Sequence, residues 1–440
     1  MRLLSSMGVM LIRASAPAFG QRERGLDGEW DVVASSSHGT AAARLVLSID
    51  GETISGTSGP LDPNRYWPLD VSGTKGADAT TLAFTFGGEP VGGLRVSVDG
   101  DRLEGTGTLY GTAVHLSGTS PRGTPGPGRT HHFRPLEYQL HFSSRIPAVL
   151  TIAPGDTIVT STVDNEGKDS GGVWRAMPGN ALTGPFYVEG AMPGDTLVVR
   201  LIRIEPNRAT AHMYGGQLNS RAIPSGYAQT RDPAANREWL LDLERGLARP
   251  ENPGERLRGF TVPLRPMIGS IGVAPPQNQA LSPADIGFHG GNLDYNRLTA
   301  GTTLYLPVFQ AGALLSLGDG HAAQGDGEIS GQGLETSMDV TFAVDLIKGH
   351  ALPQPWAEDE RSVMISGIEN SLDEALRMAT ASAALWLKHR YGMTDSEIAT
   401  FLGAVVSYDV ASIVSGRPHV VARIEKSALE MLGPTLDHAR

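Results

Sequence analysis

The segment ARLVLSIDGETISG (Ala43–Gly56) alternates apolar and polar residues around an Asp50-Gly51 pair. The same pattern returns in LRVSVDGDRLEGTGTLYGTAVHLSG (Leu94–Gly118). Alternation puts the apolar side chains on one face of a strand, and Asp-Gly is a typical hairpin turn. We therefore expect a small antiparallel β-barrel or β-sandwich over residues 26–122, acting as an accessory domain.

The chain changes character after this segment. The stretch PRGTPGPGRT (Pro121–Thr130) is rich in Pro and Gly, which predicts a linker over residues 123–130. We expect residues 131–440 to form a second domain with its own strand-like runs. These runs are Pro147–Ile152, Thr157–Val163, Thr196–Ile204, Thr303–Phe309 and Met338–Leu346.

Helices are expected only near the C-terminus. Ser371 and Glu374 form a capping-box pattern, followed by apolar residues at helical spacing up to Tyr391-Gly392. Thr394 and Glu397 open a second helix in the same way. The body of the protein is therefore expected to be mainly β with a pair of C-terminal helices, preceded by the small β domain.

Composition limits the possible chemistry. The 440 residues include 55 Gly and no Cys, so disulfides, thiolate nucleophiles and Cys-type metal sites are excluded. A net charge of −11 argues against a nucleic-acid partner, which requires a basic surface. No apolar run reaches the roughly 18 residues that a membrane span needs, so we expect no membrane partner.

The first 25 residues begin with a basic group and a short apolar stretch, and then carry small residues that resemble a cleavage site. Arg13 interrupts this pattern, so the segment is either a secretory signal or a disordered start. The protein would be periplasmic or secreted in the first case and cytoplasmic in the second.

Potentially reactive residues gather between Phe288 and Glu335, in FHGGNLDYN and GDGHAAQGDGEISGQGLE. An apolar run, GALLSL, precedes the second segment and would place it as a loop at the rim of a sheet. Imidazole and carboxylate without thiol suit a hydrolytic divalent metal site. Asp-Gly pairs are also common turn formers, and single histidines are usually structural. The candidates are His289, Asn292, Asp294, Asp319, His321, Asp326 and Glu328.

The sequence does not support three other kinds of catalytic or cofactor-binding site. Gly318–Ala323 imitates a dinucleotide fingerprint, but Gln324-Gly-Asp-Gly327 would break the helix that must follow. Neither a GxSxG elbow nor an HExxH pair occurs, so the serine-hydrolase and zincin readings have no support.

Four longer segments together resemble the acetamidase/formamidase family of small-amide hydrolases. They are NALTGPFYVEGAMPGDTL (Asn180–Leu197), PMIGSIGVAP (Pro266–Pro275), HGGNLD (His289–Asp294) and GDGHAAQGDGE (Gly318–Glu328). Their order, after PAVLTIAPGDTIVTSTVD (Pro147–Asp164), is also that of the family, and the resemblance covers about residues 131–425.

This resemblance implies a mainly β fold with sandwich-like layers, an α/β portion and C-terminal helices. It also implies homo-oligomerisation, and hydrolysis of formamide, acetamide or a similar amide at a site with a divalent metal, expected to be zinc. Glu189, in the YVEGA motif, joins the candidates only by this resemblance. The family pattern lacks the N-terminal β domain and an insert at Asn207–Glu255, which lies where substrate choice could be made.

Residue chemistry suggests roles within such a site. An amide is a poor electrophile, and a divalent ion both polarises the carbonyl and lowers the pKa of a bound water. We expect His289, His321 and Asp319 or Asp326 to hold the metal, with Glu328 as general base. Asn292 would orient the amide or its oxyanion, while Asp294 and Glu189 would bind substrate.

Two other functions stay open on sequence alone. The chain could be a secreted or periplasmic binding protein on a degenerate amidase scaffold, with the β domain recognising a polymer. It could also hydrolyse a larger amide, with the insert reshaping the pocket.

Overall fold

The computed structural model describes residues 25–37, 39–60, 68–76, 80–120, 128–213, 217–230, 237–349 and 351–435. The signal-like segment lies outside these residues apart from Gly25, and so does most of the expected linker. None of the helices in the described ranges is both long and apolar enough to cross a membrane.

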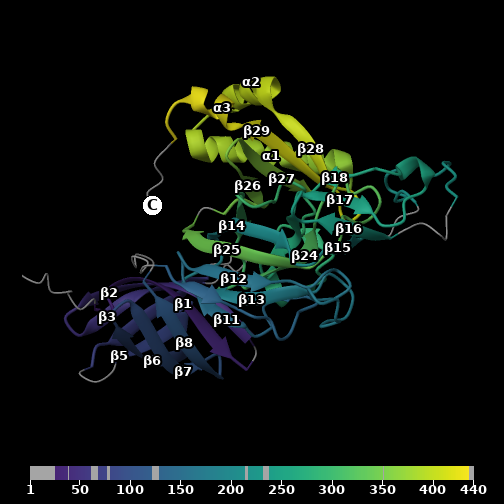
Figure 1. The fold of residues 1–440 in the computed structure, drawn as a ribbon. Helices are drawn as coiled ribbons and strands as arrows, with labels where there is room; N and C mark the ends of the chain where they lie inside the picture. Colours follow the sequence, from purple (N-terminus) through teal and green to yellow (C-terminus); the bar gives the residue numbers. More distant parts are fainter. Residues whose placement is uncertain are drawn as a thin grey trace, which may run out of the picture.

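The N-terminal domain is a closed, eight-stranded antiparallel barrel, so of the two expected architectures the barrel is confirmed (Figure 1). Its core is formed by the inward-facing residues of the alternating pattern, such as Leu45, Leu47 and Ile54. Glycine permits close strand approach, since a Cβ at Gly107 would lie 2.1 Å from the carbonyl oxygen of Gly93. The strands are β1 (Gly28–Ser36), β2 (Gly39–Asp50), β3 (Thr53–Pro60), β4 (Leu69–Thr74), β5 (Thr80–Phe86), β6 (Glu89–Asp99), β7 (Arg102–Leu109) and β8 (Thr112–Thr119).

Two further sheets form the sandwich expected for the main domain. The six-stranded sheet runs in the order β11 (Leu150–Ile152), β13 (Leu182–Val188), β24 (Leu315–His321), β19 (Met267–Gly272), β22 (Gly290–Asn292) and β21 (Ile286–Gly287). The nine-stranded sheet runs β28 (Ser407–Ser412), β29 (His419–Glu425), β27 (Ser362–Ile368), β26 (Trp356–Glu358), β23 (Thr303–Pro307), β14 (Thr196–Pro206), β25 (Met338–Ile347), β12 (Thr157–Ser161) and β9 (Thr130–His132).

The main core lies between these two sheets. Phe186 of β13 meets Phe342 of β25 edge to face, with ring centroids 5.7 Å apart. All five strand-like runs of the sequence contain a strand. The expectation of a loop from Gly318 is wrong for its first four residues, because Gly318–His321 complete β24 by pairing with β19 and β13.

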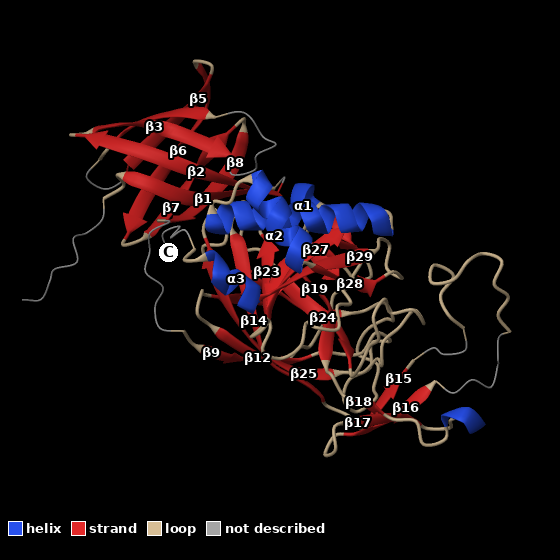
Figure 2. Cartoon of the chain, turned by 90° about the horizontal axis from the view of Figure 1, so that it is seen from above, coloured by secondary structure: helices blue, strands red, loops and turns tan. Residues whose placement is uncertain are grey.

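Helices α1 (Leu372–Tyr391) and α2 (Asp395–Val405) begin after the predicted caps, Ser371 and Thr394. They cover the outer face of the nine-stranded sheet near β27 and β29 (Figure 2). Gly367 of β27 allows this close packing, since a Cβ there would lie 2.1 Å from the carbonyl oxygen of Ala375. A short helix, α3 (Lys426–Leu429), follows β29, and 3-10 turns occur at η1 (Glu255–Leu257), η2 (Pro276–Asn278) and η3 (Glu430–Leu432).

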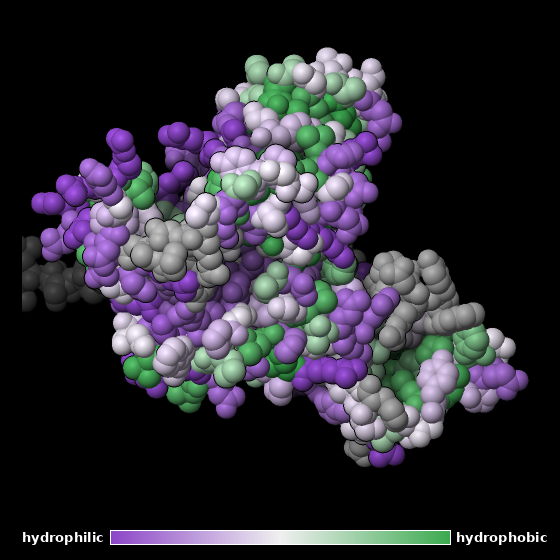
Figure 3. All heavy atoms as spheres, turned by 90° about the vertical axis from the view of Figure 1, so that its right-hand side faces the viewer, coloured by the Kyte–Doolittle hydropathy of each residue, from purple (hydrophilic) through white to green (hydrophobic). Residues whose placement is uncertain are grey.

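The expected insert forms an outlying lobe with strands β15 (Thr210–His212), β16 (Glu238–Asp242) and β17 (Leu247–Pro250), joined by β18 (Val262–Pro263). The lobe is the rightmost part of Figure 1. A two-stranded sheet of β10 (Phe142–Ser143) and β20 (Ala280–Leu281) completes the fold. The face in Figure 3 is mostly polar, and apolar side chains gather at its top and again at its lower right.

Candidate active site

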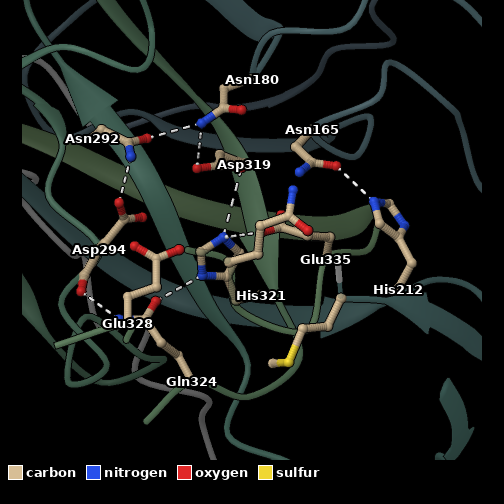
Figure 4. A network of polar contacts seen from close by, with 12 residues as sticks. Asn165, Asn180, His212, Asn292, Asp294, Asp319, His321, Gln324, Glu328 and Glu335 are labelled. Atoms are coloured by element: carbon tan, nitrogen blue, oxygen red, sulfur yellow. Dashed lines mark hydrogen bonds and ion pairs between the residues drawn. The ribbon is translucent and has the colours of Figure 1, made fainter. Parts of the chain in front are cut away.

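A cluster of buried acidic residues surrounds His321 at one end of the six-stranded sheet (Figure 4). Asp319 and His321 lie on β24, Asp294 follows β22, and Glu328 and Glu335 lie on the segment between β24 and β25. None of these side chains belongs to a residue that is more than 5% exposed. Chain segments that are distant in sequence therefore place four carboxyl groups around one imidazole.

The backbone at this cluster is unusual. Nine non-glycine residues in the described ranges have a positive φ, and four of them are Asn180, Asp294, Asp319 and Glu328. This left-handed conformation is costly for residues with a Cβ and tends to occur at functional sites. Its concentration here identifies the cluster as the candidate active site.

Asparagine side chains connect the carboxylates. Asn180 Nδ2 donates to Asn292 Oδ1 at 3.0 Å and to Asp319 Oδ2 at 2.8 Å. Asn292 Nδ2 in turn donates to Asp294 Oδ2 and, at 3.1 Å, to Ser415 Oγ. Both polar atoms of the Asn292 amide are thus already in use within the site.

Gln324 fixes the orientation of the imidazole. Its Oε1 lies 2.8 Å from His321 Nδ1, and its Nε2 donates to the carbonyl oxygen of Asp294 at 2.6 Å. Because Oε1 can only accept, His321 Nδ1 carries the proton in this contact and Nε2 faces the carboxylates. This arrangement is typical of a histidine whose second nitrogen binds a metal.

Ser412, the last residue of β28, and Ser415, in the segment that follows, complete the contacts. Ser412 Oγ donates to Glu328 Oε2 at 3.2 Å, and Ser415 Oγ donates to Asp294 Oδ2 at the same distance. Glycine leaves room for the group, because a Cβ at Gly269 would lie 2.7 Å from Asp294 Oδ1 and 2.9 Å from Asp319 Oδ2. Gly269, in the PMIGSIGVAP segment, thus leaves the space that the two carboxylates occupy.

Burial and mutual repulsion control the protonation of the cluster. Burial raises the pKa of Glu328 to about 7 and that of Glu335 to about 8. Burial, reinforced by the carboxyl groups of Glu328 and Asp319, also raises the pKa of Asp294 well above its usual value. Burial alone would lower the pKa of His321, but Glu335 and Asp319 outweigh it and raise that pKa. These carboxyl groups are therefore held partly protonated, and a bound cation would favour their charged forms.

The donor set fits a divalent cation. One oxygen each of Asp319 and Glu335 and one nitrogen of His321 lie within 4.8 Å of one another, and Asp294, His321 and Glu328 form a second such group. Asp319 Oδ1, His321 Nε2 and Glu335 Oε2 have no hydrogen-bond partner among the described residues. In the second group no buried oxygen of Glu328 is without a partner, so the first group, in which each residue has such an atom, fits a bound ion better.

Five of the eight residues expected from the sequence come together here: Asn292, Asp294, Asp319, His321 and Glu328. Asp326 does not, because Glu328 N–H bonds to the Gly325 carbonyl in a turn that leaves Asp326 exposed. Its carboxylate accepts instead from Asn296 Nδ2 at 2.7 Å. Asp326 is therefore not part of the buried donor set.

Glu189 is also far from the cluster. It follows β13 at the end opposite Asn180, about 20 Å away along a seven-residue strand. Its side chain is 41% exposed and pairs with Arg102 of the barrel at 3.5 Å. The structure thus gives Glu189 a contact between domains instead of the expected contact with substrate.

His289 belongs to neither donor group. Its ring packs edge-on against Phe142 and Phe288, with centroids 5.3 and 6.0 Å away. Neither ring nitrogen has a hydrogen-bond partner within the described ranges. Burial, with a smaller effect of Arg417, lowers the pKa of His289 to about 4, so the ring is neutral at pH 7.

The sequence reading missed Glu335, Asn180, Gln324, Ser412 and Ser415. Asn180 and Gln324 lie within the quoted motifs, so the motifs themselves were the available signal. Glu335 is the last residue of the segment GDGHAAQGDGEISGQGLE and the one carboxylate in it that was not among the candidates. The two serines carry no sequence signal, since only the packing of the C-terminal segment brings them to the cluster.

A family model described as the Acetamidase/Formamidase family matches residues 137–285 and 278–425, well over half of the chain. The chain belongs to the acetamidase/formamidase family. The matched region of this family member begins after the barrel, which ends at Thr119.

Named relatives agree with this membership. The acetamidase of Mycolicibacterium smegmatis is 28% identical over 266 residues, or 46% of this chain and 64% of that protein. The formamidase of Methylophilus methylotrophus is 26% identical over 344 residues, or 61% of this chain and 83% of that protein. The chain thus spans less than two thirds of the length of the acetamidase and most of the length of the formamidase.

Solved structures show the same fold. The acetamidase from Yersinia enterocolitica superposes with a TM-score of 0.58 and 28% identity, covering 69% of this chain and 93% of that one. The acetamidase from Bacillus halodurans gives 0.57 and 29%, covering 69% of this chain and all of the other. The β-rich architecture expected from the sequence is therefore confirmed.

Proposed function

We propose that this family member hydrolyses a small aliphatic amide, of the formamide or acetamide type, to ammonia and a carboxylate. The observation that carries the proposal is the buried histidine–carboxylate cluster. Its Asp319 Oδ1, His321 Nε2 and Glu335 Oε2 atoms make no hydrogen bond among the described residues, and His321 Nε2 lies 3.1 Å from Glu335 Oε1. Burial also supports a small substrate, since the cluster residues are at most 5% exposed. This favours a small amide over a larger one.

Asp319, His321 and Glu335 would hold a divalent cation, and zinc suits a set of one imidazole and two carboxylates. Such an ion, when bound, polarises a carbonyl oxygen and makes water a better nucleophile at neutral pH. This ligand set keeps Asp319 and His321 from the sequence expectation and replaces His289 and Asp326 by Glu335.

Glu328 suits the role of general base. It lies in the group with Asp294 and His321, and its pKa of about 7 lets it both accept and release a proton near neutral pH. Ser412 orients it through the hydrogen bond to Oε2. The proton taken from water can then pass to the nitrogen of the leaving amine.

Asp294 suits recognition of the amide group. Its Oδ2 accepts from Asn292 and Ser415, whereas its Oδ1 is buried without a partner among the described residues. That free oxygen can accept an N–H of the substrate. Because both atoms of the Asn292 amide are already bonded, we assign Asn292 to the positioning of Asp294 in place of oxyanion binding.

A panel of amides assayed for ammonia tests the proposal. Formamide, acetamide, propionamide, benzamide and a peptide amide are compared with purified full-length protein, with and without added Zn²⁺. Release from the smallest amides, declining with acyl size, is the expected result. Ammonia from none of them would support a binding protein on an amidase scaffold, and preference for the peptide amide would support a larger substrate.

The homo-oligomer implied by the family also remains a proposal. Light scattering coupled to size-exclusion chromatography would test it, and a monomer at micromolar concentration would contradict it.

A further inference from the structure

We infer that Arg221, in the insert, is a positioning residue of the amidase site; the inference rests on the proposed function. The insert lies outside the reactive motifs, yet one of its side chains reaches the segment behind the carboxylates. Arg221 Nη1 donates to the carbonyl oxygen of Ser415 at 2.5 Å and lies 3.4 Å from that of Ile413.

The segment that Arg221 holds carries two contacts to the site. Ser412 donates to Glu328, the proposed base, and Ser415 donates to Asp294, the proposed acceptor of the amide. Ser412 is fixed as the last residue of β28, but residues 413–415 belong to neither a helix nor a strand, so regular structure does not fix Ser415. The guanidinium group binds carbonyls at both Ile413 and Ser415 and therefore restrains the segment where the serines act.

A second contact attaches the same part of the insert to the other side of the site. The backbone N–H of Asn219 donates to the carbonyl oxygen of Ile329, next to Glu328, at 2.7 Å. Asn219 Oδ1 accepts from the Arg221 N–H at 3.0 Å, which stiffens the turn between the two attachments. Residues 219–221 thus connect the segment bearing Glu328 to the segment bearing Ser415.

Arg221 can be substituted without disturbing the hydrophobic core. The residue is exposed and its interactions are polar, so its removal opens no cavity in the core. Without the guanidinium the residues from Ile413 to Ser415 gain freedom, and the Ser415 hydroxyl is in place to donate to Asp294 for a smaller fraction of the time. We expect this to lower kcat more than it raises KM.

The experiment compares Arg221→Ala and Arg221→Lys with Arg245→Ala, an exposed arginine of the same lobe that pairs only loosely with Asp242 at 3.8 Å. For the Ala variant, kcat for the best amide should fall about tenfold, KM should change less than threefold and Tm should stay within a few degrees. The kcat of the Lys variant should lie between those of the wild type and the Ala variant, and added guanidinium ion should restore part of the kcat of the Ala variant. Arg245→Ala should match the wild type.

Hydrogen exchange gives a readout that does not depend on turnover. Amides of residues 412–417 should exchange faster in Arg221→Ala, while those of α1 stay unchanged. Unchanged exchange, or unchanged kcat in an active enzyme, would overturn the inference. If the wild type released no ammonia, the proposed function would fail, and exchange would still decide whether Arg221 holds the segment.

Discussion

Asn180 donates a hydrogen bond to Asp319 across 2.8 Å, although 139 positions separate them in sequence. The same Nδ2 donates to Asn292, so one amide links a residue before β13 to strands β22 and β24. Its positive φ of 59° sets the direction of this side chain. The relationship shows how backbone conformation and side-chain bonding together form the site.

Asn180→Gly tests this link, because glycine keeps the left-handed backbone and removes only the amide. We expect kcat to fall about 10- to 100-fold, since two hydrogen bonds to site residues are lost. Gln277→Gly is the matched control, an exposed residue with a φ of 58° that is not part of the cluster. Equal activity of the two variants would contradict a role for Asn180.

Glu328→Gln should reduce kcat by about 10²- to 10⁴-fold, the usual contribution of a general base. The amide keeps the size of the side chain, so circular dichroism and Tm should remain close to those of the wild type. Glu189→Gln serves as the comparison, because that residue pairs with Arg102 at the barrel. A larger loss in Glu189→Gln than in Glu328→Gln would reverse the assignment made from the geometry.

Metal content separates the two proposed ligand sets. We expect Glu335→Gln to lose most bound metal in elemental analysis, and Asp326→Asn to retain it, because Asp326 is exposed and bonded to Asn296. Added Zn²⁺ should raise the Tm of the wild type and of Asp326→Asn by mass action, but not that of Glu335→Gln. Metal lost from Asp326→Asn and kept by Glu335→Gln would restore the set expected from sequence.

We expect the ionised carboxylate of Asp156 to stabilise the fold in a way that acid removes. Burial would raise the pKa of its carboxyl, but hydrogen bonds from Ala153 N–H, Arg129 N–H and His131 outweigh burial and lower it to about 2. Since the folded pKa lies below the ordinary value, the stabilisation is present above pH 4 and disappears as the pH falls toward 2.

Asp156→Asn should therefore cost roughly 2 kcal/mol of unfolding free energy at pH 6. Denaturant unfolding of both proteins between pH 6 and pH 2.5 measures the difference, which should shrink as the solution becomes more acidic. A difference that stays constant across this range would show that protonation of Asp156 is not its source.

Lys348 attaches the barrel to the main domain. Its Nζ lies 2.9 Å from Asp31 Oδ2 of β1 and 2.5 Å from Asp195 Oδ2 before β14, and these carboxylates are 1% and 3% exposed. Lys348→Met leaves buried carboxylates with one fewer cation and should lower the free energy of unfolding by about 3 kcal/mol. Lys388→Met, which removes an exposed pair with Asp395, should lower it by at most about 1 kcal/mol. Thermal unfolding of both variants measures the difference.

Local sequence patterns predicted much of the fold because their causes are local. Alternating residues around Asp50-Gly51 predicted hairpins, and the caps at Ser371 and Thr394 placed both long helices. The choice between barrel and sandwich depended on whether β1 pairs with β8, a contact between chain segments more than 80 residues apart. Alternation along each strand cannot specify that closure.

The sequence alone determined the family, the absence of thiol chemistry, and five of the residues that meet in the candidate site. Tertiary structure decided which carboxylates accompany His321: strand pairing and turns bring Glu335 in, and leave Asp326 in solvent and Glu189 at the barrel. It also brought Asn180, Ser415 and Arg221 to the site. Spacing along the chain specifies which side chains are available, whereas burial and the direction of each Cα–Cβ bond decide which of them meet.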